Sequence, residues 1–129
     1  MRKRNCLKLL PALAFIVVIQ KVSASEIECE EALSNFAMIQ CEQRELDRAN
    51  KELLEELRHL KNRLQPDEQE ALDRGQAAWV AYRDAHCDSI VETYAAGSGG
   101  PLAGVKCQAD LTKDRIKQLR QSFADRLSR

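Results

Sequence analysis

The chain has 129 residues, with 20 basic and 20 acidic side chains that give a formal net charge of zero at pH 7. Five of the basic residues and none of the acidic residues lie in positions 1–24, so residues 25–129 carry 15 basic and 20 acidic side chains, a net charge of about −5. This acidic balance argues against nucleic acid and anionic membrane surfaces as partners, and it favours encounter with a basic protein.

The first 24 residues have the three parts of a secretory signal peptide. Four basic residues lie between positions 2 and 8, an apolar stretch follows over positions 9–19, and Val22 and Ala24 occupy the positions that signal peptidase reads. The apolar stretch is about half of the roughly 20 residues that a membrane-spanning helix needs, and no cysteine stands in the context of a lipoprotein signal. We therefore expect cleavage after residue 24, one mature domain over residues 25–129 without a membrane anchor, and a periplasmic or secreted bacterial protein.

Removal of the signal peptide would take Cys6 away and leave four cysteines, Cys29, Cys41, Cys87 and Cys107. An even number of cysteines in a small exported domain predicts two disulfides, because such a domain gains stability from cross-links and its compartment permits them. Four cysteines allow three pairings, and the spacing favours Cys29 with Cys41 and Cys87 with Cys107. A continuous helix between the first two would hold them about 18 Å apart, beyond the roughly 7 Å limit between bonded α-carbons. The first pairing therefore requires the chain to turn after Cys29.

The first helix is predicted for residues 34–64, with Ser34 and Asn35 as its cap residues. Its apolar residues recur at intervals of three, four and seven and form one stripe: Ile39, Leu46, Leu53, Leu57, Leu60 and Leu64. Asn50 lies on the same stripe, where a polar side chain is expected to fix the register of helix pairing. Pro66 then restarts the helix, so a helical hairpin is expected.

The second helix is predicted for residues 66–94, and the stretch 95–101 must end it because three glycines and a proline discourage continuation. Gly75 lowers stability by about 1 kcal/mol relative to alanine in a helix, which suggests that another helix approaches closely there. The third helix carries apolar residues at helical spacing: Leu111, Ile116, Leu119, Phe123 and Leu127. No alternating run predicts a strand, so the expected fold is all-α, a small antiparallel bundle of three principal helices tied by two disulfides.

The segment AWVAYRDAHC, residues 78–87, contains the residue types of a cysteine nucleophile with a base and an acid. We expect no catalytic residue in it, because Cys87 in an oxidising compartment is a disulfide half rather than a thiolate. His86 is the next residue along the helix and points elsewhere, whereas a base must come within about 3 Å of its nucleophile. The two histidines, His59 and His86, lie on different helices without ligand-spaced partners, so no metal or other cofactor is expected.

A structural role explains the same segment better. Trp79 is expected to pack in the core with the Arg83 guanidinium stacked on it, four residues along the same helical face, and Tyr82 flanks them. Arg83 and Asp84 are adjacent, so they point about 100° apart and are expected to reach different neighbours. These four residues form the predicted structural motif, which would fix how the third helix docks.

A family resemblance rests on residues from this segment and beyond: Gln76, Trp79, Tyr82, Arg83, Asp84, Cys87, Gly97, Ser98, Cys107, Leu111, Thr112 and Arg115. Their order resembles the pattern of the lysozyme inhibitor LprI-like domain family, and Cys29 and Cys41 fit that family's paired cysteines. Ala49 stands where the family usually has leucine. The resemblance covers nearly all of residues 25–129 and implies an exported helical domain with lysozyme as its partner and no catalysis of its own.

Two functions remain open from the sequence. The first is inhibition or binding of a lysozyme, or of another basic envelope protein, by an acidic surface. The second is a structural or adaptor module of the periplasm, which binds another protein or self-associates through the leucine stripe of the first helix. The sequence does not identify the partner-binding residues; the candidates are exposed acids near the first hairpin, Glu55, Glu56, Asp67, Glu68 and Glu70, or the loop over residues 97–100.

Overall fold

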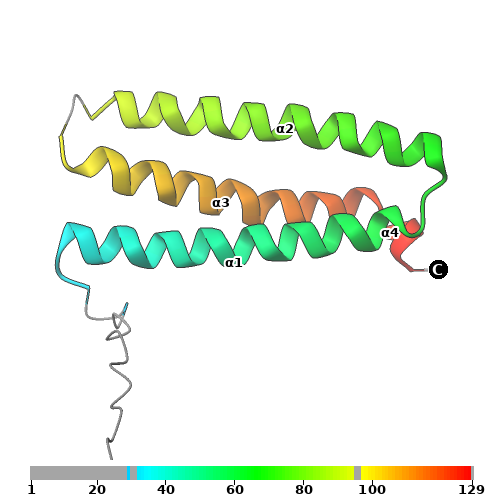
Figure 1. Ribbon diagram of the computed structural model, residues 1–129, viewed down its shortest axis with the longest axis horizontal. Coiled ribbons are helices and arrows are strands. Elements are labelled where there is room, and N and C mark those ends of the chain that lie inside the picture. Colours follow the sequence, from blue (N-terminus) through cyan, green and yellow to red (C-terminus); the bar gives the residue numbers. More distant parts are fainter. Residues whose placement is uncertain (1–28, 30–31, 95–96, 129) are drawn as a thin grey trace, which may run out of the picture.

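The computed structural model describes residue 29, residues 32–94 and residues 97–128, and the expected signal peptide lies outside them. This part of the chain forms three long helices and one short helix: α1 (Asn35–Lys61), α2 (Pro66–Glu92), α3 (Gly99–Ser122) and α4 (Ala124–Leu127). None of the described residues is in a strand. The predicted all-α fold of three principal helices is confirmed, and successive long helices run antiparallel to one another (Figure 1).

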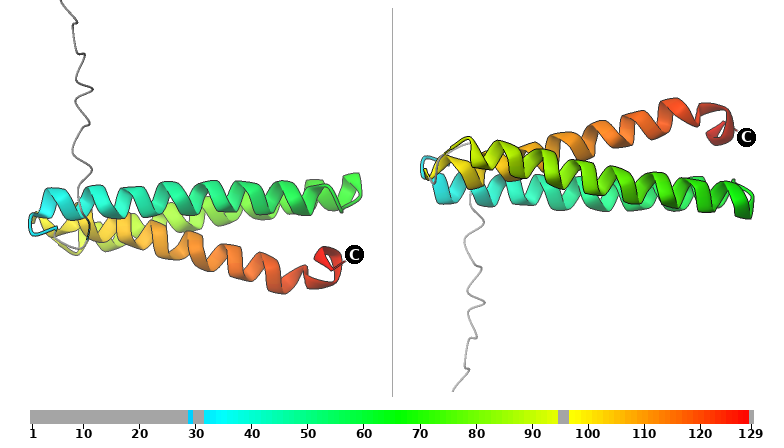
Figure 2. Two further views of the ribbon diagram at one scale, coloured as in Figure 1. Left: turned by 90° about the horizontal axis from the view of Figure 1, so that it is seen from below. Right: turned by 90° about the horizontal axis from the view of Figure 1, so that it is seen from above.

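The middle position in the bundle belongs to α3. α1 and α2 each pack against α3 rather than against one another, and α3 lies between them in Figure 1. Toward its C-terminal end α3 diverges from the other two long helices, as both views in Figure 2 show.

The hydrophobic core lies toward the hairpin that joins α1 to α2. Its buried members come from all three long helices and that hairpin: Leu53, Leu60, Leu64, Leu72, Ile116 and Leu119. Four half-buried residues pack against this cluster: Leu57, Trp79, Phe123 and Leu127. Burial of one aliphatic side chain contributes about 1.5 to 3 kcal/mol, so the predicted leucine stripe of α1 is the main stabilising face of that helix.

The starts of α1 and α2 agree with the sequence, whereas the ends of both helices come earlier than predicted. The Ser34 hydroxyl accepts a hydrogen bond from the Ala37 N–H at 3.1 Å, as its expected capping role requires. α1 ends at Lys61 rather than at residue 64, because the Arg63 and Leu64 amides turn back to carbonyls three residues earlier and tighten the last turn. α2 likewise ends at Glu92, two residues before the predicted end.

The glycines of the second hairpin do more than end a helix. α3 begins at Gly99, inside the stretch predicted as a loop. A Cβ on Gly104 would lie 2.7 Å from Cγ2 of Val91, and one on Gly100 would lie 3.4 Å from Cγ1 of the same valine. These two glycines therefore allow α3 to approach α2 closely. The close approach predicted at Gly75 is wrong, since a Cβ there would meet nothing within 4 Å.

The third helix is interrupted before its predicted apolar stripe ends. Phe123 has φ −113° and ψ 21°, outside the helical region, and separates α3 from α4. The break allows Phe123 and Leu127 both to pack against the core cluster from beyond the end of α3. The sequence pattern alone gave no reason to expect it.

Candidate functional site

Arg83 is the centre of the motif predicted in the middle of α2. Its Nη1 donates hydrogen bonds to Oδ1 of Asn50 on α1 and to Oγ1 of Thr112 on α3, both at 3.3 Å. The Thr112 side chain is fully buried, and its hydroxyl in turn donates to the carbonyl of Gln108 at 2.7 Å. Arg83 therefore connects all three long helices, and Asn50 has the contact between helices that was expected of it. We call Asn50, Arg83 and Thr112 the latch.

The expected separation of Arg83 from Asp84 is wrong. Nε of Arg83 donates to Oδ1 of Asp84 at 2.9 Å, and Nη2 lies 2.8 Å from the same oxygen. The two side chains leave the helix about 100° apart, but the long arginine stem bends back toward its neighbour. The Arg83 side chain is 14% exposed, whereas that of Asp84 is 47% exposed. The carboxylate thus balances the charge of Arg83 from the solvent side of the latch.

Two guanidinium groups contact the Trp79 ring, and one of these contacts was expected from the sequence. Cζ of Arg83 lies 5.3 Å from the centre of the indole ring, and Cζ of Arg115 on α3 lies 5.7 Å from it. Nε of Arg115 donates to the side-chain oxygen of Gln76 at 3.2 Å. Burial lowers the pKa of Arg115 from its ordinary value. Both Arg115 and Gln76 belong to the residue pattern quoted for the family. That pattern was the sequence feature that grouped them with Trp79.

The remaining residues of the segment show why it holds no nucleophile. The sulfur of Cys87 is bonded to that of Cys107, so no thiolate is available there. The His86 ring stacks on the Tyr82 ring, with centroids 5.6 Å apart. Tyr82 is 55% exposed, so it lies outside the packed part of the motif.

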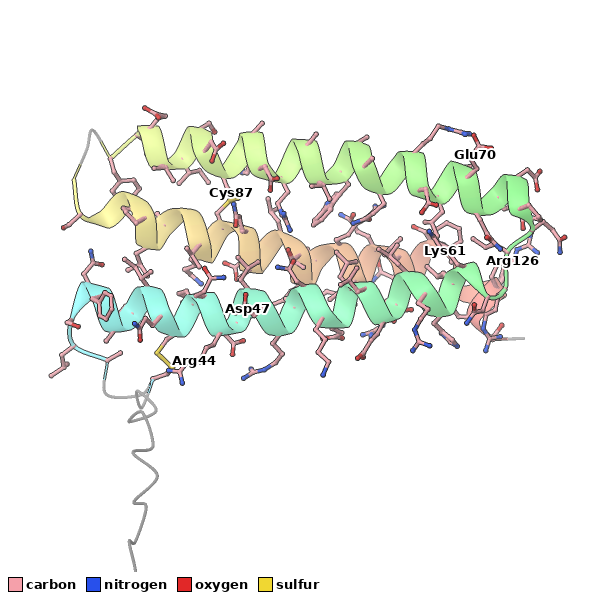
Figure 3. All side chains as sticks on the ribbon, in the orientation of Figure 1. Arg44, Asp47, Lys61, Glu70, Cys87 and Arg126 are labelled. Atoms are coloured by element: carbon pink, nitrogen blue, oxygen red, sulfur yellow. A yellow bond between two sulfur atoms is a disulfide. The ribbon has the colours of Figure 1, made fainter. Side chains whose placement is uncertain are left out.

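Both favoured disulfide pairings are confirmed. The α-carbons are 5.7 Å apart in Cys29–Cys41 and 5.6 Å apart in Cys87–Cys107, within the limit for a bridge. The second bridge is buried between α2 and α3, and the first joins the segment before α1 to α1 beside Arg44 (Figure 3). Nη2 of Arg44 lies 3.0 Å from the Cys29 sulfur. The chain turns before Ser34, as the first pairing requires.

The acids near the first hairpin do not form one free acidic patch. Three of the five candidates are held by arginines, in the pairs Glu56–Arg120, Glu68–Arg126 and Glu70–Arg74. The first two pairs join α1 to α3 and α2 to α4, so they contribute to helix packing. Glu55 and Asp67 are exposed, and neither forms an ion pair with another described residue.

The second candidate surface, residues 97–100, is smaller than expected. Only Gly97 and Ser98 precede α3 and are exposed, whereas Gly100 is buried against α2. The Asn35 side-chain amide donates to the Ser98 carbonyl, which ties this turn to the start of α1. The turn is therefore part of the packed end of the bundle.

The described residues contain no group of three His, Cys, Asp or Glu side chains arranged to hold a metal ion. Among the helices that the structure describes, none is both long and apolar enough to cross a membrane. The fold and the site thus define a small helical protein held by two disulfides and a polar latch.

The comparisons with known proteins agree with this class. A family model described as "Lysozyme inhibitor LprI" matches residues 29–119, a span that includes both disulfides and the latch. The chain belongs to the LprI lysozyme inhibitor family. An uncharacterized protein of Rhizobium meliloti (strain 1021) is 27% identical over 109 residues, which cover 74% of this chain and 78% of that protein. No solved structure matches the chain.

Proposed function

We propose that the chain is exported and inhibits a lysozyme by binding to it, without catalysing a reaction itself. The observation that carries this proposal is the family match over residues 29–119. Three features support it. The two disulfides suit an oxidising compartment, residues 1–24 have the pattern of a cleaved signal peptide, and the net charge of about −5 on residues 25–129 favours encounter with a basic enzyme.

A periplasmic structural or adaptor module is the second candidate. Its sequence argument was the leucine stripe, but Leu53 and Leu60 are buried in the core, so self-association would need other apolar side chains. Phe36 and Leu54 on α1 are both 68% exposed and could supply such a contact. Light scattering of the purified protein tests this candidate, and a monomer at high concentration would contradict self-association.

The test of the proposed function is a lysozyme assay with the oxidised chain of residues 25–129. Increasing amounts are added to lysozymes of several types, and the clearing of a cell-wall suspension is followed. Dose-dependent loss of activity is expected, with binding that weakens as salt is raised because charged surfaces attract less strongly under screening. The reduced and alkylated chain is the control. No inhibition of any type at about 50 µM, which corresponds to binding weaker than about −6 kcal/mol, would remove the proposal.

A further inference from the structure

A groove of about 550 Å³ lies between the first half of α2 and the C-terminal end of α3. It opens where α3 diverges from the other long helices (Figure 2). Its apolar lining includes Ala71, Leu72, Leu119 and Phe123. Ligand sites in proteins commonly measure about 300 to 1,000 Å³ and have mainly apolar walls with a few polar groups, so the size and lining suit a small ligand.

Arg115 is the polar group that distinguishes this groove. Arg115 lines the groove, and its one hydrogen bond to a described residue is the bond from Nε to Gln76. Its two terminal nitrogens have no partner among the described residues, and no carboxylate there pairs with it. Arg83 differs, since its guanidinium contacts the Asp84 carboxylate. A guanidinium with unused donors that still reach solvent favours binding of an anion, because the anion adds charge-assisted hydrogen bonds to those donors.

The charges at the other end of the groove limit the kind of anion. Arg126 borders the groove, but it is already paired with Glu68 at 2.6 Å. Asp125 adds a second carboxylate at that end. Arg115 is the one cation of this lining without a carboxylate partner, and the other end holds the Glu68–Arg126 pair and Asp125. This arrangement favours a ligand with a single negative charge at the Arg115 end.

Gly75 lines the groove and offers a position from which the groove can be tested. It lies in the interior of α2, where glycine lowers stability by about 1 kcal/mol relative to alanine. No helix packs against it, since a Cβ there would meet nothing within 4 Å, and it lines the groove. A larger side chain at this position would occupy the groove without disturbing the helix contacts.

We propose that this groove binds a small amphipathic carboxylate, whose carboxylate accepts two hydrogen bonds from Arg115 and whose aliphatic chain lies over Leu72, Leu119 and Phe123. Arg115 and Ser122 are about 10 Å apart along α3, which is the length of an extended eight-carbon chain. The site is independent of lysozyme inhibition, and neither proposal needs the other.

Trp79 supplies the signal for the test, because it is the single tryptophan of the chain and lies beside Arg115. Octanoate is titrated into the oxidised chain of residues 25–129, with 1-octanol and octyltrimethylammonium as uncharged and cationic controls. Octanoate is expected to change the Trp79 emission saturably, and to bind at least tenfold more tightly than either control. Equal binding of octanoate and 1-octanol would overturn the proposal.

Two variants test where the ligand binds. Arg115→Gln is expected to weaken octanoate binding at least tenfold, to the level of 1-octanol. Gly75→Leu is expected to block octanoate while leaving the helical circular dichroism unchanged, and Gly75→Ala, the matched control, is expected to bind as the wild type does. Octanoate binding to Gly75→Leu with wild-type affinity would contradict the site even if Arg115→Gln failed to fold. Lysozyme inhibition by Gly75→Leu is measured separately and is expected to be unchanged.

Discussion

Asn50 on α1 and Arg83 on α2 are joined by a 3.3 Å hydrogen bond between helices that do not pack directly on one another. The same guanidinium nitrogen also donates to Thr112 on α3. Nearer the first hairpin, a second connection between α1 and α2 is the ion pair of Lys61 with Asp73 (Figure 3). Polar contacts thus join α1 to α2 in addition to the apolar core to which both helices contribute.

Replacement of Arg83 tests the latch. Arg83→Met keeps the length of the stem but removes the hydrogen bonds to Asn50 and Thr112, and it leaves their oxygens without this donor. We expect the free energy of unfolding to fall by about 1 to 3 kcal/mol, measured by urea denaturation with both disulfides intact. The control is Arg74→Met, which breaks an ion pair whose side chains are 67% and 75% exposed and should change stability by less than about 0.5 kcal/mol. Equal effects of the two changes would contradict a special role for the latch.

The two disulfides are expected to contribute unequally. Each closes a short loop, with 12 residues of separation in the first and 20 in the second, for which loop entropy predicts about 3 kcal/mol. Cys87 is 1% exposed and lies between two helices, whereas Cys29 is exposed and precedes α1. We therefore expect the melting temperature to fall further for Cys87→Ala with Cys107→Ala than for Cys29→Ala with Cys41→Ala. A larger fall in melting temperature for Cys29→Ala with Cys41→Ala would show that the segment before α1 contributes more to stability than the packing of α3 does.

Alanine substitutions at two helical glycines are expected to have opposite signs. Gly75→Ala should raise the free energy of unfolding by about 0.5 to 1 kcal/mol, because its Cβ meets no atom within 4 Å and helix propensity improves. Gly104→Ala should lower it by about 1 kcal/mol, because its Cβ would lie 2.7 Å from a methyl group of Val91, whose β-branched side chain is stiff in a helix. In a Val91→Ala background, Gly104→Ala should become stabilising. Destabilisation in both backgrounds would mean that Val91 is not the cause.

Acid pH is expected to weaken the contact of α1 with α3 at Glu45. The Lys113 ammonium, which donates to this carboxylate at 3.1 Å, lowers the pKa of Glu45 below its ordinary value of 4.5. A carboxyl whose pKa is depressed by folding stabilises the protein above its unfolded pKa, and that contribution is lost as the pH falls through the folded pKa. Because the Glu45 side chain is 37% exposed, the contribution is expected to stay well below 1 kcal/mol.

Stability measured against pH, from neutral to below 4.5, checks this expectation. The difference between wild type and Glu45→Gln should be present at neutral pH and should shrink as the pH falls below 4.5. Glu55→Gln, which removes the charge of an exposed acid on the same helix, is the matched control. A difference that does not depend on pH would exclude the ion pair as its source.

The sequence predicted those features that depend on local pattern. The 3.6-residue period placed three helices, Ser34 was identified as a cap, and the cysteine spacing favoured the pairings that the structure has. Each of these follows from residues near one another in the chain.

Features that depend on which helix surfaces pack together in the fold were not predicted from the sequence. A close approach was expected at Gly75 and was found at Gly104 instead, because helical sequence does not show which glycine faces Val91. Glu56 and Glu68 looked free because their arginine partners, Arg120 and Arg126, come from helices about 60 residues away in the sequence. The angle between adjacent helical residues predicted separate partners for Arg83 and Asp84. The flexible stem of arginine instead bends back, so that Arg83 donates a hydrogen bond to Asp84.

The central claim is that this member of the LprI lysozyme inhibitor family binds a lysozyme through its folded, oxidised bundle. The most direct measurement is isothermal titration of residues 25–129 into lysozymes of several types, with the wild type compared with Arg83→Met and with the reduced, alkylated chain. The account predicts saturable binding of at least one lysozyme by the wild type, with matching loss of activity, and no binding by the reduced chain. Binding by neither form, or equal binding by both, would contradict it.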